Sequence, residues 1–204
     1  MDTENTPQPL PMAAQQDCKG KEEPKDPAQT DYEEGVEFLK NKSHAQAANC
    51  FHNAMVGFDQ KGDKKGMANA ADKLGDICLE RQEFEKALDY FEKPFSVCME
   101  FNDVFSLLAL RKKMALCHTE LKQSSEAINH YLDLLDLYEQ MHNPASSVDV
   151  LVKIAEIYYG DKNLQGAIDA YKTASAIHTN FKHRNHAQKL MDKAEEIEKE
   201  LASS

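Results

Sequence analysis

A repeat of 40 residues constrains this chain more than any other feature of its sequence. Four alanines stand 40 residues apart, and an aromatic residue follows each by four positions: Ala47 and Phe51, Ala87 and Phe91, Ala127 and Tyr131, Ala167 and Tyr171. Twelve residues before each alanine stands a second tiny residue: Gly35, Gly75, Ala115 and Ala155. A fixed period of this length is typical of a solenoid of stacked helical units. Because solenoids usually present an extended binding surface, the repeat predicts a binding protein without identifying its partner.

Composition excludes several classes of function. The 204 residues are 41% hydrophobic, enough for a continuous core, and the formal net charge of -11 predicts that the chain binds neither nucleic acid nor an anionic membrane surface. The sequence starts without a basic segment leading into an apolar run, and nowhere do eighteen apolar residues stand together. We therefore expect a cytoplasmic protein. Its five cysteines, odd in number and without CxxC spacing, are expected to be reduced.

The repeat divides the chain into segments. Residues 1–27 are rich in proline and polar side chains and predict a disordered tail, with a docking peptide that folds on a partner as the alternative. Four helical hairpins are expected at about 28–63, 64–103, 104–143 and 144–183, each with a short polar turn between its helices. The remainder, 184–204, predicts a capping helix with Ala187, Leu190, Ala194, Ile197 and Leu201 on its apolar side, or alternatively a helix offered to a second protein.

Residues expected at the ends of helices repeat with the same 40-residue period. Asp63, Asp103 and Asn143 stand 40 residues apart, and each is expected to cap the N-terminus of the helix that follows. Pro144 stands at a first-turn position, where its missing N–H costs nothing. Pro94 instead falls inside an expected helix, where it removes a hydrogen bond, and it predicts a kink.

The repeated unit resembles the tetratricopeptide repeat, which has a Leu-Gly pair, an aromatic three residues on, and then Ala and an aromatic in its second helix. The second and fourth units carry Leu74-Gly75-x-x-Cys78 with Ala87-x-x-x-Phe91, and Ile154-Ala155-x-x-Tyr158 with Ala167-x-x-x-Tyr171. The period exceeds the usual 34 residues, as in the kinesin light chain and in bacterial Rap-type regulators. The resemblance implies an all-α, right-handed solenoid of four hairpins plus a C-terminal capping helix; HEAT or armadillo stacking is the alternative architecture.

The resemblance also implies a concave groove lined by the first helix of each unit. Three of its acids, Asp72, Asp76 and Glu80, would repel one another unless a cation lay between them, which favours a basic and partly apolar protein or peptide as partner. A merely solvated stripe is the alternative. The groove residues expected from the family are Tyr32, Val36, Leu39, Lys40, Asn69, Asp72, Asp76, Leu79, Glu80, Lys112, Leu116, Thr119, Glu120, Asp149, Val152, Glu156 and Tyr159.

Common catalytic motifs are missing from the sequence. It contains no GxxxxGK[ST], GxGxxG, HExxH or GxSxG, so we expect neither an enzyme nor a bound cofactor. The best metal-like cluster is His178, His183 and His186, but spacings of five and three do not place three imidazoles on one helical face, and we expect no metal. Cys78 and His118 occupy the aromatic slot and are interpreted as core residues, with a redox or pH sensor as the alternative.

We therefore expect a non-enzymatic scaffold or adaptor that binds a partner segment in its concave groove. Two alternatives stay open at this point. One is a regulator of a phospho-signalling protein, resembling the Rap type. The other is a self-assembling structural subunit, since solenoids can form homo-oligomers through their ends.

Overall fold

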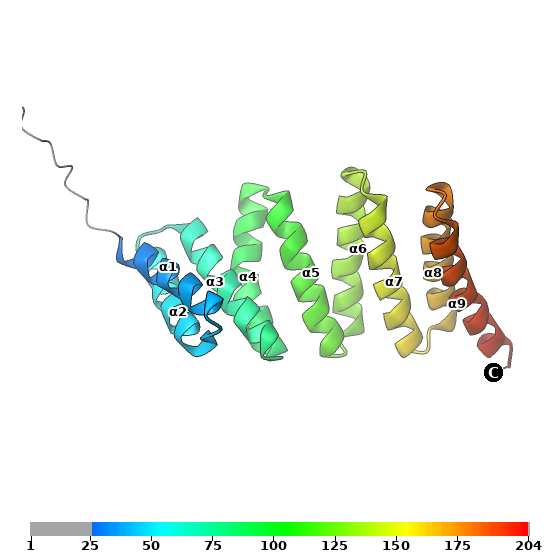
Figure 1. The fold of residues 1–204 in the computed structure, drawn as a ribbon, viewed down its shortest axis with the longest axis horizontal. Helices are drawn as coiled ribbons and strands as arrows, with labels where there is room; N and C mark the ends of the chain where they lie inside the picture. Colours follow the sequence, from blue (N-terminus) through cyan, green and yellow to red (C-terminus); the bar gives the residue numbers. More distant parts are fainter. Residues whose placement is uncertain (1–25, 204) are drawn as a thin grey trace, which may run out of the picture.

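The computed structural model describes residues 26–203, which form nine α-helices and no β-strand. Figure 1 shows the helices following one another in chain order along the longest axis of the molecule, and each packs against its neighbours in sequence. The helices are α1 (Pro27–Lys40), α2 (His44–Gln60), α3 (Lys64–Glu80), α4 (Phe84–Phe101), α5 (Val104–Glu120), α6 (Ser124–Gln140), α7 (Pro144–Gly160), α8 (Leu164–Asn180) and α9 (Arg184–Ser203). The predicted solenoid of four hairpins, with α9 as its cap, is confirmed. The expected tail lies outside the described residues except for Asp26 and Pro27.

All eight turns between helices use the same backbone geometry. One residue in each turn has a φ between 51° and 70°, and these residues recur every 20 positions: Lys42, Gly62, Gln82, Asn102, Lys122, His142, Lys162 and Lys182. The next residue then donates its N–H to the carbonyl five residues earlier, as Ser43 does to Phe38 at 2.8 Å. This is the Schellman arrangement that ends a helix and reverses the chain. Seven turns place a side chain where glycine is preferred, at a cost of about 1–2 kcal/mol each.

The three predicted N-caps are confirmed. A side-chain oxygen of Asp63 accepts a hydrogen bond from the Gly66 N–H at 2.9 Å, and Asp103 and Asn143 cap α5 and α7 in the same way. Each cap supplies an acceptor to a first-turn N–H that has no partner inside the helix. Pro144 is the first residue of α7, as expected.

The tiny residues mark the closest approaches between helices. Ala47, Ala87, Ala127 and Ala167 are completely buried. A Cβ added to Gly75 would lie only 2.4 Å from Cε1 of Phe91, and one added to Gly35 would lie 2.9 Å from Cε1 of Phe51. The backbone of the first helix in a hairpin thus rests directly on the aromatic ring of the second, which is why the tiny residue and the aromatic recur together.

Three clusters of buried apolar side chains run along the solenoid, centred on α1–α3, α4–α5 and α5–α9. Pro94 is buried inside α4, which is continuous from Phe84 to Phe101, so the expected kink stays a prediction. In α9, Ala187, Ala194 and Ile197 are buried and Leu190 is half-buried, as expected for the apolar side of a capping helix. Leu201 lies in the last turn of α9 and is exposed.

Candidate interaction surface

The first helix of each hairpin contributes to one face of the molecule, which we call the odd-helix face. It consists of the predicted groove residues of α1, α3, α5 and α7, every one of which is exposed or half-buried. Cavities open between consecutive helices of this set, with the intervening even-numbered helix beneath them.

A cavity of about 380 Å³ lies between α5 and α7. Its walls include Leu116, Thr119 and Glu120 from α5 and Glu156 from α7, all four of them predicted groove residues. Tyr131 of α6 also lines it. The structure therefore brings together residues that are separated by about 40 positions in sequence, because the period sets α5 and α7 in matching orientation.

A second cavity, of about 340 Å³, lies between α3 and α5. Leu79 and Glu80 of α3 face Leu116 and Glu120 of α5 across it. Leu116 and Glu120 thus line both cavities, which makes them the centre of the odd-helix face. Leu116 is 41% exposed and is the apolar side chain that the two cavities share.

A third cavity, of about 200 Å³, includes Lys112 and Asp149 in its lining. In contrast, the α1 residues do not join these cavities. Tyr32, Val36 and Leu39 pack against the α1–α3 core cluster, and Tyr32 contacts Phe51 edge to face at 5.4 Å between ring centroids. Burial raises the pKa of the Tyr32 hydroxyl. At this end of the face the predicted groove residues serve packing.

The acidic stripe on α3 receives its cation from inside the molecule. Lys113 of α5 places its Nζ 2.7 Å from an oxygen of Asp72 and 2.6 Å from one of Asp76. Burial alone would lower the pKa of Lys113, but its bonds to the two carboxylates raise it, so the lysine stays charged. Burial raises the pKa of Asp76 in spite of its bond to Lys113, and the neighbouring charge of Asp72 raises it further. The repulsion from which a basic ligand was predicted is therefore already countered at Asp72 and Asp76 by a lysine of the chain itself.

The remaining acids of the stripe have different surroundings. Oε2 of Glu80 lies 3.2 Å from Nε2 of His44; the glutamate side chain is exposed and the histidine is half-buried. Among the described side chains that line the α3–α5 cavity there are two carboxylates, Glu80 and Glu120, and no lysine or arginine. The α3–α5 cavity therefore presents its negative charge through Glu80 and Glu120, whereas Asp72 and Asp76 are bridged by Lys113.

Several residues that line the cavities were not among the predicted groove residues, and three of them have large side chains. Phe84 lines the α3–α5 cavity, while Tyr131 and Lys153 line the α5–α7 cavity. Tyr131, an aromatic residue of the repeat, is largely buried and yet lines the α5–α7 cavity. Lys153 lies 2.9 Å from Glu156, and this hydrogen bond is the main cause that raises the pKa of the lysine. The spacing of three residues between Lys153 and the predicted groove residue Glu156 places both on one side of α7, and this spacing could have identified the lysine from the sequence.

Tyr159 links the odd-helix face to the cap. Its hydroxyl donates a hydrogen bond to Oε2 of Glu200 in α9 at 3.0 Å, and this bond raises the pKa of the phenol. Tyr159 is therefore tied to the capping helix, although its ring stays exposed.

Five of the eight histidines lie in two groups. His178, His183 and His186 lie with ring centroids 5.3 to 6.3 Å apart, closer than their spacing suggested, because α8 and α9 meet at this turn. Within residues 26–203, no group of three His, Cys, Asp or Glu side chains is arranged to hold a metal ion. Burial lowers the pKa of His178, and the two neighbouring histidines lower it further, while Asp149 opposes them.

The second group surrounds the aromatic slot of the third repeat. His118 stacks on His130 with 5.4 Å between ring centroids, and its Nδ1 lies 2.7 Å from Oε1 of Gln123. Burial lowers the pKa of His130, as do the adjacent His118 and Arg111, and Asp133 opposes them. Cys78, in the same slot one repeat earlier, is half-buried against the α4–α5 cluster, and burial raises its pKa. Both slot residues therefore contribute to packing.

Comparison with known proteins assigns the family. The sequence model described as soluble NSF attachment protein, SNAP, matches residues 11–134, a segment that runs from before α1 into α6. The chain belongs to the soluble NSF attachment protein family. No curated protein sequence matches this SNAP-family chain.

Solved structures confirm the tetratricopeptide-like fold of this SNAP-family protein. The apo form of RapI has a TM-score of 0.65 at 16% identity, covering 83% of this chain and 62% of that one. A Podosopora anserina putative kinesin light chain with nearly identical TPR-like repeats has a TM-score of 0.63 at 13% identity, covering 89% and 100%. Aspartyl phosphate phosphatase F from Bacillus subtilis has a TM-score of 0.61 at 13% identity, covering 84% and 47%. At these identities the similarity shows the fold alone, and the chain spans less than two thirds of RapI.

None of the helices between residues 26 and 203 is both long and apolar enough to cross a membrane.

Proposed function

We propose that this protein is a non-enzymatic, cytoplasmic scaffold or adaptor that binds a segment of a partner protein along its odd-helix face. The observation that carries the proposal is the exposed Leu116 at the junction of two adjoining cavities. A binding segment that crosses α3, α5 and α7 would cover this side chain and remove its apolar surface from water. The name of the family, an attachment protein, describes binding rather than catalysis and supports the same class of function.

The partner segment is proposed to be basic and partly apolar. An apolar side chain would enter the α3–α5 cavity between Leu79 and Leu116, and a lysine or arginine next to it would meet Glu80 and Glu120. The proposed charge recognition is thus one turn away from the Asp72 and Asp76 pair, whose carboxylates Lys113 already bridges. Electrostatic attraction of this kind sets orientation and association rate more than affinity, so the apolar contact provides most of the binding energy.

The proposal is tested with a displayed library of random peptides selected on the full-length protein. Peptides selected on the wild type should lose at least about tenfold in affinity for Leu116→Asp, because a carboxylate would be buried at the centre of the interface. Leu132→Asp is the matched control, since Leu132 is also large, apolar and exposed (47%) but lies on α6 and lines neither cavity. Peptides that bind Leu116→Asp as well as the wild type, or that lose affinity only for Leu132→Asp, would refute the assignment of the face.

A second candidate is regulation of a phospho-signalling protein. The fold is similar to RapI and to a protein that its title names an aspartyl phosphate phosphatase, which is the specific observation in its favour. A phosphate-release assay with a phosphorylated response regulator separates the two, because a scaffold leaves the rate unchanged and a regulator of this kind alters it.

A further inference from the structure

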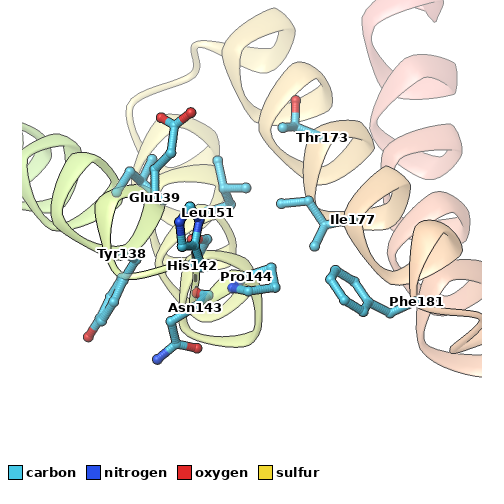
Figure 2. A pocket seen from close by; sticks show the side chains of 11 residues that line it. Tyr138, Glu139, His142, Asn143, Pro144, Leu151, Thr173, Ile177 and Phe181 are labelled. Carbon is cyan, nitrogen blue, oxygen red and sulfur yellow. Dashed lines mark hydrogen bonds between the residues drawn. The ribbon is translucent and has the colours of Figure 1, made fainter.

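A further, apolar cavity lies on the side of the solenoid opposite the odd-helix face. It is formed between α6 and α8, next to the first half of α7. It has a volume of about 510 Å³ and is lined by apolar side chains that include Leu135, Pro144, Leu151, Ile177 and Phe181. We call it the even-helix groove. Figure 2 shows Ile177 and Phe181 of α8 pointing toward Pro144 across the open space, with Leu151 and His142 on the α7 side.

One repeat earlier, the same position is filled by the chain itself. Shifting Leu135, Leu151 and Thr173 back by 40 residues gives Phe95, Arg111 and Asp133. The Arg111 guanidinium lies 5.0 Å from the centroid of the Phe95 ring and forms an ion pair with Asp133, and its side chain is only 15% exposed. A charged, stacked side chain therefore occupies this space in the third repeat. In the fourth repeat shorter side chains leave it open.

The chain also carries an apolar projection of matching character, which we call the knob. Met99 and Phe101 at the end of α4, and Val104 and Phe105 at the start of α5, are all exposed, and Phe105 is the most exposed at 75%. Met99 and Val104 stand one period before Glu139 and Pro144, which line the even-helix groove. The knob and the groove therefore lie on the same edge of the solenoid, one repeat apart.

We propose that a second copy of this chain occupies the even-helix groove, with the knob of each copy inserted into the groove of the other. Since the two features are neighbours on one edge, a two-fold axis between them satisfies both contacts at once and closes the assembly as a dimer. Aromatic side chains bury about 150–250 Å² each, so the exposed fractions of the four knob residues amount to roughly 400 Å². Two knobs and two grooves then bury roughly 1,600 Å², the size of a standard stable interface.

Charge supports the same arrangement. Lys65 lies beside the knob, with its Nζ 4.7 Å from the centroid of the Phe101 ring, and Glu139 lies on the groove rim. Inserting the knob brings this lysine to the glutamate of the other copy. For a chain with a net charge of -11, attraction at the contact offsets part of the repulsion between copies.

The test is sedimentation of the full-length chain and of variants over a range of concentrations. The wild type should dimerise, and Phe105→Ser should raise the dimer Kd by at least about tenfold. The double variant Leu151→Arg with Thr173→Asp copies the Arg111–Asp133 pair into the groove and should do the same while preserving helix content and thermal midpoint. Leu132→Ser, at an exposed leucine that lines no part of the groove, should dimerise like the wild type.

Mixing the two defective variants gives the decisive result. The Leu151→Arg, Thr173→Asp copy keeps an intact knob, and the Phe105→Ser copy keeps an open groove. The mixture should therefore form a heterodimer, although neither variant dimerises by itself. A wild type that remains monomeric at about 100 µM, well above the Kd of a stable interface of this size, overturns the proposal in favour of a different occupant. A mixture that does not recover dimer, or a Leu132→Ser chain as defective as Phe105→Ser, also overturns it.

Discussion

Gly75→Ala is the sharpest test of the close packing between helices. The added Cβ would lie 2.4 Å from Cε1 of Phe91, whose ring is completely buried, so the ring would have to move by about 1 Å to regain van der Waals contact. Overpacking of this kind costs about 1–3 kcal/mol. Alanine gains about 1 kcal/mol over glycine inside a helix. We therefore expect a net loss in the free energy of unfolding of up to about 2 kcal/mol.

Gly160→Ala is the matched control, because nothing lies within 4 Å of a Cβ at that position. It should stabilise the protein by up to about 1 kcal/mol, so the two variants should differ by about 1–3 kcal/mol. For a chain of this size the thermal midpoint shifts by about 2–4 °C per kcal/mol, well within the resolution of circular dichroism. In a Phe91→Leu background the clash is removed and Gly75→Ala should become stabilising. If Gly75→Ala raised the midpoint as much as Gly160→Ala, the close approach would not be the reason for glycine.

Three further predictions concern stability. Lys113→Met leaves the Asp72 and Asp76 carboxylates without their shared cation, and should lower the free energy of unfolding by about 1–3 kcal/mol, less than for a fully buried pair because these side chains are partly exposed; an unchanged urea midpoint would contradict the bridge. Lys122→Gly relieves a φ of 60° and should raise the free energy of unfolding by about 1 kcal/mol, while Gly62→Ala should lower it by a similar amount; equal effects of both changes on the thermal midpoint would rule out this account. The pKa values of His130 and His178 are lowered in the folded protein, so this contribution to stability is complete above the ordinary histidine pKa of 6.5 and is lost below it, where the unfolded chain takes up protons that the folded chain resists. His130→Phe and His178→Phe should each flatten the pH profile of the thermal midpoint between pH 7 and 5, and a profile that kept its slope in both variants would refute this.

The repeat unit could be read from the sequence because its physical cause is local. A tiny residue and an aromatic can recur at a fixed interval only if each hairpin makes the same contact, and Gly75 with Phe91 shows that contact directly. The third repeat pairs Ala115 with Tyr131, whose ring is slightly exposed, whereas Phe91 is fully buried. In the fourth repeat Ala155 likewise pairs with Tyr171, so alanine stands where the aromatic is tyrosine and glycine where it is phenylalanine.

The turns were predicted less completely. Only Gly62 and Asn102, of the eight residues with positive φ, belong to types that favour this conformation. Lysine, glutamine and histidine at the other turns carry no such signal in the sequence. Their geometry is imposed by the packing of the two flanking helices, which requires the chain to reverse within three residues.

The sequence by itself determined the number of helices, their order, and which residues of each face the core, because periodicity and side-chain size act within one hairpin. The tertiary structure alone decided where the charges are paired and where space remains. Lys113 reaches Asp72 from 41 residues away, and Arg111 fills a hollow that its counterpart Leu151 leaves open. Such pairings depend on which long side chain reaches across to the next helix, and that distance exists only after the helices have stacked.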